Sequence, residues 1–294
     1  MSSDVRSVLR RFNRTYTQRI GVLDESFLGT GRPLAVSRLL HEIGSAEGSS
    51  VLALRDRLDL DSGHLSRMLR RLEAEGLVET GADPADRRRR LARLTPAGRA
   101  AYDDLERRSE ERAGALVAPL TPRQRERLAE ALASADLLVR AATVRLEPVL
   151  PEDPRAVEAT RRYVAELAGR FPGGFAPGRL PPDPDATYVL ATSDGEPVAY
   201  GGIRPEPALS ESSGLRVAEI KRMWVHESWR GAGLGSRMLR HLEDLARDAG
   251  FRRVALDTNG ALVEAIALYD RSGYARTERY NDNPYAEAFF LKDL

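Results

Sequence analysis

The sequence predicts an α+β protein of two domains: a mostly helical N-terminal domain with one β-hairpin, and a C-terminal domain of mixed helices and strands. A length of 294 residues makes two domains the default expectation. Helical spacing of apolar residues dominates the first half, and strand-like patterns alternate with helical ones in the second. The change falls within Ala142–Pro148, so we expect domains at residues 1–142 and 143–294.

Charge divides the chain at nearly the same place. Residues 1–145 hold 26 arginines and no lysine against 21 acidic residues, which gives +5. Residues 146–294 hold 17 arginines and two lysines against 23 acidic residues, which gives −4 and a total of +1. A basic half joined to an acidic half indicates that the two domains bind different partners.

Composition excludes several classes of protein. The sequence has no run of about 18 apolar residues that could span a membrane, and its first residues lack the apolar core of a signal peptide. The absence of cysteine excludes disulfides and thiolate metal sites, and it fits the reducing cytoplasm, where we expect the protein. The four histidines form no cluster, so no metal is expected.

The N-terminal domain has the pattern of a helix-turn-helix protein. Amphipathic helices are predicted at residues 3–28, 34–44 and 51–58. A further helix begins near residue 62 and ends at Gly76, because glycine favours the conformation that terminates helices. The inward face of this last helix is expected to consist of Leu65, Met68, Leu69 and Leu72.

A β-hairpin follows this helix. Residues 77–80 and 91–95 are predicted strands, and the tip between them carries four consecutive arginines. Thr95 then caps another helix, with Pro96 at its first position. The order of recognition helix, arginine-rich wing and the exit Leu94-Thr95-Pro96-Ala97-Gly98 resembles the MarR family of winged-helix repressors over about residues 5–142.

These features predict contacts with DNA. A helix that fits the major groove presents polar side chains to base edges, and crowded arginines repel one another unless phosphates neutralise them. A solvated charge run is the plainer interpretation of the wing, and His64 alone fits an ordinary polar residue at a helix start. In the family one wing arginine enters the minor groove, and four adjacent arginines leave open which one does so here. The expected DNA-binding residues are Ser62, His64, Ser66, Arg67, Arg70, Arg87, Arg88, Arg89 and Arg90.

The same resemblance implies a homodimer built from the first and last helices of this domain. Thr121-Pro122 begins a helix that suits this role, because it has an apolar face. A two-fold dimer would bind a pseudo-palindromic operator in double-stranded DNA, with half-sites about 34–36 Å apart. The apolar residues on that helix are Leu128, Leu132, Ala135, Leu138 and Val139.

The most informative feature of the C-terminal half is a glycine turn between a strand and a helix. The predicted strand 217–225 leads to Arg230-Gly231-Ala232-Gly233-Leu234-Gly235, and a helix with apolar residues at helical spacing begins at once. Glycines let the backbone turn sharply, and the free N–H groups of a helix start bind diphosphate. Arg230 adds a fork of donors at the mouth of this turn.

Two other interpretations of the turn are weaker. A dinucleotide fingerprint, for which Asp257 lies at a suggestive distance, needs glycine where the chain has Ser236 or Met238. A purely structural turn is the plainer alternative. Over residues 143–294 the predicted order is a helix (154–170), a hairpin (188–203), a strand, the turn, a helix, a strand (252–257), a helix (261–272) and closing strands (274–280 and 286–291). This order and the pattern Arg-x-x-Gly-x-Gly resemble the GNAT acetyltransferases.

The resemblance implies a site for acetyl-CoA. Tyr269, in the run Leu268–Tyr274, matches the family's Tyr-x-x-x-Gly signature, in which the hydroxyl faces the coenzyme sulfur as a general acid. A strand glutamate often draws the amine proton through water in the family, which indicates Glu219, expected on the same face as Lys221 and Met223. The plainer roles are a packing tyrosine and a surface ion pair. The expected coenzyme-binding residues are Met223, Trp224, Val225, Arg230, Gly231, Ala232, Gly233, Leu234, Gly235, Ser236, Asn259 and Tyr269.

The sequence therefore predicts a dimeric DNA-binding regulator fused to an acetyl-CoA-dependent N-acetyltransferase. The acceptor site is expected between residues 171–184 and 280–285, whose aromatic and acidic content suits a small cationic or amino-acid-like amine. Protein lysines stay open as acceptors. One alternative is a regulator whose second domain only senses acyl-CoA, and another is an enzyme that uses its first domain only to dimerise. Glu219 and Tyr269 favour turnover, and the arginine-rich wing favours DNA binding.

Overall fold

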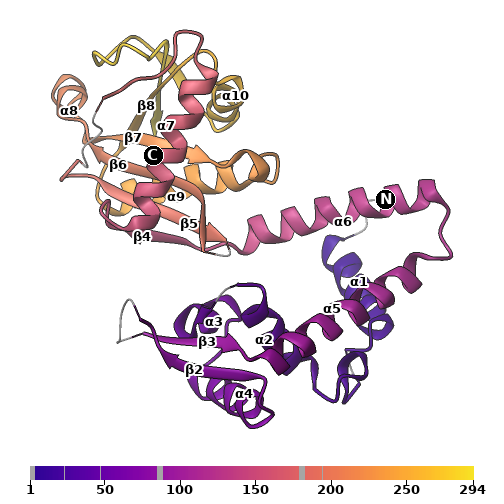
Figure 1. The fold of residues 1–294 in the computed structure, drawn as a ribbon. Helices are drawn as coiled ribbons and strands as arrows, with labels where there is room; N and C mark the ends of the chain where they lie inside the picture. Colours follow the sequence, from indigo (N-terminus) through magenta and orange to yellow (C-terminus); the bar gives the residue numbers. More distant parts are fainter. Residues whose placement is uncertain (1–3, 23, 47, 85–88, 179–182, 194) are drawn as a thin grey trace. The chain divides into compact units, whose positions relative to one another are not determined.

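The computed structural model describes residues 4–22, 24–46, 48–84, 89–178, 183–193 and 195–294. The chain divides into two compact units, Met1–Ala129 and Glu130–Leu294. The first is mostly helical with a small sheet, and the second is built on a seven-stranded sheet with helices (Figure 1). This agrees with the predicted α+β class, a helical domain with a β-hairpin followed by a mixed domain. Within these residues no helix is both long and apolar enough to cross a membrane.

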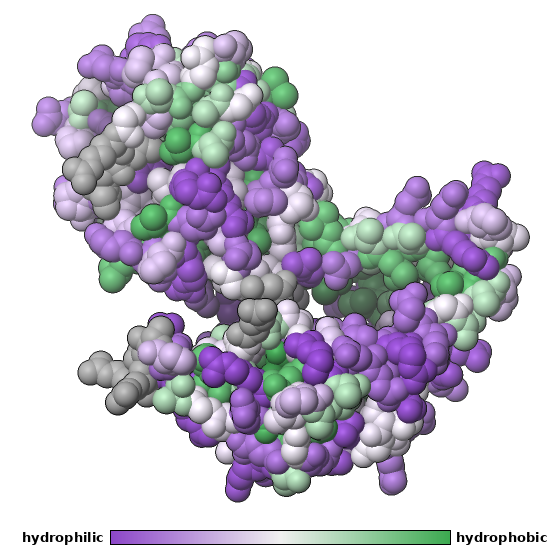
Figure 2. Space-filling view, in the orientation of Figure 1, coloured by the Kyte–Doolittle hydropathy of each residue, from purple (hydrophilic) through white to green (hydrophobic). Residues whose placement is uncertain are grey.

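The first unit is a winged helix. Its elements are α1 (Val5–Arg19), the 3-10 helix η1 (Phe27–Gly29), α2 (Leu34–Gly44), β1 (Ser49–Ser50), α3 (Val51–Arg57), α4 (Ser62–Ala74), β2 (Val78–Ala82), β3 (Arg90–Leu94) and α5 (Pro96–Val117). The strands form an antiparallel sheet in the order β1-β3-β2, and the β2–β3 hairpin is the wing. The long helix α6 (Pro122–Thr143) begins in this unit, and apolar residues gather on its surface (Figure 2).

The amphipathic pattern of α4 determines how this helix packs. Its start is fixed by Asp61, whose carboxylate accepts a hydrogen bond from the backbone N–H of His64 at 2.8 Å. Its inward residues join the core of the unit beside α2 and the wing, which leaves the opposite face exposed. The buried residues of α4 are Leu65, Met68, Leu69 and Leu72, as predicted.

The first helix is shorter than predicted. Apolar spacing extended it over residues 3–28, but α1 ends at Arg19, and Gly21 follows with a φ of 74°. This left-handed conformation ends the helix, and the apolar residue Phe27 belongs to η1 instead. No residue of α1 is buried.

Close packing explains the glycine at the exit from the wing. Thr95 donates its backbone N–H to the Leu77 carbonyl at 3.0 Å and its hydroxyl to the Gly76 carbonyl at 2.6 Å. A β-carbon added at Gly98 would lie 1.8 Å from the same Leu77 oxygen. Glycine therefore lets α5 start directly against the strand region of the wing.

The second unit is a mixed α/β fold. The strand order is β4-β5-β6-β7-β8-β10-β9, in which β7 and β8 are parallel and the other described neighbours are antiparallel. The short helix α8, which starts with a proline, is an element that the apolar pattern did not predict. The elements after α6 are β4 (Leu146–Val149), α7 (Pro154–Arg170), β5 (Thr187–Ser193), β6 (Glu196–Pro205), α8 (Pro207–Ser213), β7 (Val217–Val225), the 3-10 helix η2 (Glu227–Trp229), α9 (Leu234–Asp248), β8 (Arg253–Thr258), α10 (Val263–Arg271), β9 (Ala275–Thr277) and β10 (Ala288–Asp293).

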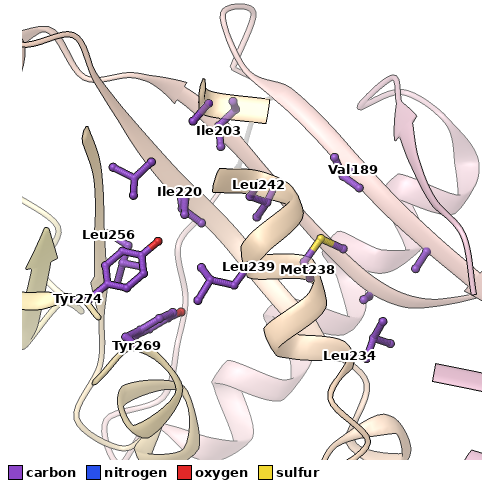
Figure 3. Close-up of a cluster of buried hydrophobic side chains, with 14 of the residues drawn as sticks. Val189, Ile203, Ile220, Leu234, Met238, Leu239, Leu242, Leu256, Tyr269 and Tyr274 are labelled. Carbon is purple, nitrogen blue, oxygen red and sulfur yellow. The ribbon is translucent and has the colours of Figure 1, made fainter. Parts of the chain in front are cut away.

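Helices cover both faces of this sheet. Ala156 and Ala159 of α7 pack on one face with the rings of Tyr188 and Tyr200. On the other face α9 packs its apolar side against the strands, as Figure 3 shows. The buried residues labelled there on α9 are Leu234, Met238, Leu239 and Leu242.

The last turns of α6 belong to the second unit. Ala141 is buried in its core, and the guanidinium of Arg140 lies 4.7 Å from the centre of the Trp229 ring. Arg237, in the first turn of α9, donates to the carbonyl of Ala141 at 2.9 Å. The units thus divide between residues 129 and 130, inside a continuous helix and 13 residues before the boundary expected after residue 142.

Strands β7 and β8 separate partway along their length. Val217–Glu219 pairs with Arg253–Ala255, but β7 continues to Val225 and β8 to Thr258. Arg222 has a φ of 53°, and the register of β7 against β6 shifts beside it. This bulge turns β7 away from β8, so an opening forms between the ends of the two strands.

Candidate active site and DNA-binding surface

Two adjoining cavities lie where β7 and β8 separate. Cavity 1, of about 730 Å³, is lined by the end of β7, the glycine turn, α7 and α10. Cavity 2, of about 530 Å³, is lined by α7, β7, β8 and the segment before β10. Tyr163, Met223 and Tyr269 line both, which places Tyr269 at their junction.

Most of the residues predicted for the coenzyme line cavity 1. Ala232 and Leu234 instead pack into the hydrophobic core. Asn259 lines cavity 2, where its amide donates to the Tyr285 carbonyl at 2.8 Å. The predicted residues that do line cavity 1 are Met223, Trp224, Val225, Arg230, Gly231, Gly233, Gly235, Ser236 and Tyr269.

The backbone of the glycine turn suits an anion. Gly231 and Gly233 have φ angles of 79° and 84°, and a β-carbon built on either would meet no neighbouring atom within 4 Å. Backbone conformation, rather than space, therefore requires glycine at both positions. The Arg237 N–H donates to the Gly233 carbonyl inside α9, so the N–H groups just before it point out of the helix start. The positive end of the helix dipole lies at the same place.

Arg230 lies at the edge of cavity 1 and is held by the protein. Its guanidinium pairs with the Glu166 carboxylate and donates to the Val225 carbonyl at 3.1 and 3.2 Å. Glu166 also pairs with Arg170 at 3.3 Å and accepts from the Trp224 indole at 2.9 Å. A diphosphate at the turn would share Arg230 with Glu166, a residue that the sequence prediction did not include.

Tyr269 is a buried phenol. Its exposure is 6%, and its ring centre lies 5.8 Å from that of Tyr274 and 5.6 Å from that of Phe290. Burial, and then the neighbouring Tyr163 and Asp257, raise the pKa of Tyr269 above its ordinary value. The hydroxyl therefore keeps its proton at neutral pH, as a proton donor must.

Glu219 lies outside the linings of both cavities. It has no exposed surface. The face that it was expected to share with Met223 is not continuous, because the bulge at Arg222 breaks the alternation of β7. Its carboxylate is enclosed by four donors, which are Arg204 at 2.9 Å, Lys221 at 3.2 Å, Tyr280 at 3.0 Å and Asn281 at 3.1 Å.

A different carboxylate lines cavity 2. Asp257 stands near the end of β8 with its side chain 4% exposed. It accepts hydrogen bonds from Lys221 at 2.8 Å and from the Asn283 amide. Its position near the carboxyl end of a strand parallel to β7 is the sequence signal that could have identified it. Among the described residues no group of histidine, aspartate or glutamate side chains is arranged to hold a metal ion.

The predicted DNA-binding residues of α4 lie together on its outer face. Arg87 and Arg88 of the wing fall outside the described residues. Arg90 begins β3 and donates to the Thr80 hydroxyl, and Arg89 precedes it. Of the predicted residues on α4, Ser62, Ser66, Arg67 and Arg70 are exposed, and His64 is partly exposed.

Comparison with known proteins identifies both units. Residues 157–274 match the acetyltransferase (GNAT) family, and residues 37–98 match a winged helix DNA-binding domain. The IAA acetyltransferase of Azospirillum brasilense is 31% identical over 119 residues, which are 40% of this chain and 74% of that protein. Across three such curated relatives the chain spans 52–74% of their length.

Solved structures resemble the two units separately. A GNAT-family acetyltransferase from Staphylococcus aureus is 12% identical and covers 51% of this chain and 99% of its own, with a TM-score of 0.40. A MarR-family regulator from Rhodococcus is 21% identical and covers 46% of this chain and 96% of its own, with a TM-score of 0.38.

The fold and the two cavities define an acetyltransferase domain, and it is joined to a winged-helix DNA-binding domain. The chain belongs to the acetyltransferase (GNAT) family.

Proposed function

We propose that the second unit transfers an acetyl group from acetyl-CoA to a primary amine of a small molecule. The observation that supports this most strongly is the position of Tyr269, a protonated phenol at the junction of the two cavities. The N–H groups of the glycine turn, with Arg230, would hold the diphosphate. The edge of β7 at Met223–Val225, which β8 does not pair with, would border the pantetheine arm.

The chemistry needs no protein nucleophile, because the amine attacks the thioester carbonyl directly. A carbon–nitrogen bond forms and the carbon–sulfur bond breaks. The departing thiolate takes a proton from Tyr269, the nitrogen releases its proton to solvent water, and the phenolate regains a proton from solvent, so the protons balance. Because four donors enclose Glu219, we propose that it positions Lys221 and the segment with Tyr280 instead of drawing the amine proton.

We also propose that the first unit binds a pseudo-palindromic operator in double-stranded DNA as a homodimer. The outer face of α4 and the wing supply polar and basic side chains for the bases and phosphates. Unburied apolar faces on α1 and α6 support the dimer, because such faces mark protein interfaces. These faces carry Val5, Leu9 and Phe12 on α1, and Leu132, Leu138 and Val139 on α6, all between 41% and 74% exposed.

A regulator that senses acyl-CoA without turnover is the second candidate. The ion pairs made by the carboxylates that line the cavities favour this second candidate. Glu166, Glu264 and Asp257 are each paired with a cation, which leaves no spare base among the described lining residues. In this alternative the glycine turn binds the coenzyme and Tyr269 only packs.

The decisive experiment uses the full-length protein with acetyl-CoA and a panel of primary amines. Release of free coenzyme thiol that depends on the amine, with the acetylated amine found by mass spectrometry, supports the transferase. Binding of acetyl-CoA by calorimetry without any product identifies the sensor. Absence of both binding and product contradicts the whole assignment of this unit.

A further inference from the structure

One side of cavity 2 is made of aromatic rings. We call it the aromatic wall, and it consists of Tyr163 on α7, Phe171 and Phe175 after α7, and Tyr285 before β10. Ring centres are 5.5 Å apart for Phe171 and Phe175, 4.7 Å for Phe175 and Tyr285, and 6.3 Å for Tyr163 and Phe175, all edge to face. Phe171 is buried, whereas the other three are partly exposed. Partly exposed rings around a cavity offer apolar surface that a ligand can cover.

Hydrogen bonds hold the aromatic wall in place. The Tyr285 hydroxyl accepts from the Ala176 N–H at 3.2 Å, which ties the segment after α7 to the segment before β10. The backbone of Tyr285 is fixed at both of its polar groups, by the Asn259 amide at 2.8 Å and by the Asn283 side-chain oxygen at 3.1 Å. The wall is therefore preorganised, so a ligand does not have to order it on binding.

The strands contribute polar groups to the same cavity. Lys221 and Asp257 come from β7 and β8, and Asn283 hydrogen-bonds Asp257. The negative charge of Asp257 acts on the pKa of two phenols, that of Tyr163 on the aromatic wall and that of Tyr269 at the junction of the cavities. Burial first, and then Asp257, raises the pKa of Tyr163 to about 12, and the same two causes act on Tyr269. A carboxylate with two bonded donors still has lone pairs for a third.

We propose that the acetyl acceptor is an aromatic primary amine, whose ring packs on the aromatic wall and whose nitrogen lies between Asp257 and Tyr269. The inference rests on the proposed function, because it names the substrate class of the same site. The ring and amine could belong to a simple arylalkylamine or to an aromatic amino acid. Lys221 and Arg222 also line the cavity, and they are the cations that an α-carboxylate would meet.

This arrangement favours aromatic over aliphatic or highly polar amines. A ring on the wall gains edge or stacking contacts in addition to the apolar area it buries. A polyamine would bring a second ammonium into a cavity that Lys221 and Arg222 also line, and these cations repel it. An amino sugar would set hydroxyl groups against the rings of the aromatic wall, where they lose water without gaining hydrogen-bond partners. The selectivity should therefore appear in kcat/KM for the acceptor and not in the affinity for acetyl-CoA.

The test compares four acceptors with the full-length protein and acetyl-CoA: phenethylamine, phenylalanine, butylamine and spermidine. We expect the better aromatic acceptor to exceed butylamine and spermidine by at least about tenfold in kcat/KM. A preference for phenylalanine identifies the amino acid, and a preference for phenethylamine identifies the amine without a carboxylate. Equal or faster acetylation of butylamine or spermidine overturns the inference and leaves the transferase assignment standing.

Substitutions in the aromatic wall test whether these residues cause the preference for aromatic acceptors. Phe175→Leu and Tyr285→Leu should bring the ratio of aromatic to butylamine kcat/KM toward one, whereas Val157→Ala, an exposed position on α7, should leave it unchanged. An unchanged ratio in both wall variants overturns the inference.

If acetyl-CoA binds but no amine is acetylated, the proposed activity fails. In that case the inference is tested separately, by calorimetric titration of amines into the protein loaded with acetyl-CoA. Tighter binding of phenethylamine than of butylamine supports the inference, and equal binding overturns it.

Discussion

At the scale of single residues, burial of Tyr269 determines the protonation state of the proposed proton donor. The ring is packed among other aromatic rings, and the hydroxyl is kept neutral because its ionised form would be buried near Asp257. The phenol is therefore in the protonated form that a proton donor requires. It is a weaker acid than a thiol, whose pKa is ordinarily about 8.5, so its transfer of a proton to the thiolate is uphill and needs the phenolate to regain a proton from solvent. The same burial also makes the residue part of the core, so chemistry and packing must be separated experimentally.

Tyr269→Phe keeps the ring and removes the proton. We expect kcat to fall by about 10²–10⁴ while the affinity for acetyl-CoA stays within about twofold, because a general acid contributes to the transition state. Steady-state kinetics and calorimetry measure the two quantities.

The pH profile of the wild-type protein is the control for this variant. The protonated phenol is the active form, and it is lost only as pH rises through the raised pKa. Hence kcat/KM should increase as the amine deprotonates and should not decline below about pH 10. A decline between pH 8 and 9 that disappears in Tyr269→Phe would contradict the assignment.

Gly98→Ala should destabilise the winged-helix unit severely. The new β-carbon would lie 1.8 Å from the Leu77 carbonyl oxygen, so the backbone of α5 or of the wing must move. We expect a loss of about 2 kcal/mol or more in the free energy of unfolding of this unit, measured by denaturant titration.

Gly114→Ala on the same helix is the control for Gly98→Ala. No neighbouring atom lies within 4 Å of its β-carbon, so this variant should be neutral or stabilising by up to about 1 kcal/mol. Equal effects of the two variants would refute the packing argument.

At the scale of elements, the proposed DNA-binding surface consists of α4 and the described part of the wing. The double variant Arg67→Ala, Arg70→Ala should weaken operator binding at least about tenfold and reduce the slope of log affinity against log salt by about 1–2, because each phosphate contact releases counterions. Fluorescence anisotropy over a salt series measures both. Arg161→Ala, an exposed arginine on α7, is the matched control and should change neither. A salt slope that stays the same in the double variant would favour the first unit as a scaffold for dimerisation.

The elements also show how far sequence patterns predict this structure. The inward face of α4, the bounds of β7 and the glycine turn followed from apolar spacing and from glycine placement. The end of α1 could not be predicted in this way, because the apolar pattern continues past Gly21 although the helix ends before it. Sequence spacing also did not reveal the division of the two units inside α6. A helix that passes from one hydrophobic core to another keeps the same spacing of apolar residues throughout.

The candidate site was predictable only in part, and the reason is β7. Strand alternation placed Glu219 beside Met223, but Arg222 adopts a left-handed conformation that no pattern of period two contains. The bulge opens the sheet, and Asp257 then lines the cavity while Glu219 is enclosed. The contacts of Glu166 and the aromatic wall join segments far apart in sequence, so spacing could not reveal them.

For the whole molecule, α6 is the element that both units share. It begins in the first unit, and its end is fixed in the second by Arg237 and Trp229, which flank the glycine turn. We therefore expect acetyl-CoA to change operator affinity, by about fivefold or more, and operator DNA to change acetyl-CoA affinity by the same factor, as linkage requires. Anisotropy with and without saturating acetyl-CoA measures the first factor, and calorimetry with and without DNA measures the second. Identical operator affinity with and without acetyl-CoA would show that α6 carries no coupling.

The most direct test is calorimetric titration of acetyl-CoA into three proteins: the wild type, Gly233→Ala and Gly214→Ala. Gly233 and Gly214 both have left-handed φ angles with open space around the missing β-carbon, so both variants carry similar backbone strain, of about 1–2 kcal/mol. Only Gly233 lines cavity 1 at the start of α9. We predict that the wild type binds acetyl-CoA, that Gly233→Ala binds at least about tenfold more weakly, and that Gly214→Ala stays within about twofold of the wild type. Equal affinity in all three proteins, or no binding to the wild type at millimolar acetyl-CoA, would contradict the assignment of the glycine turn.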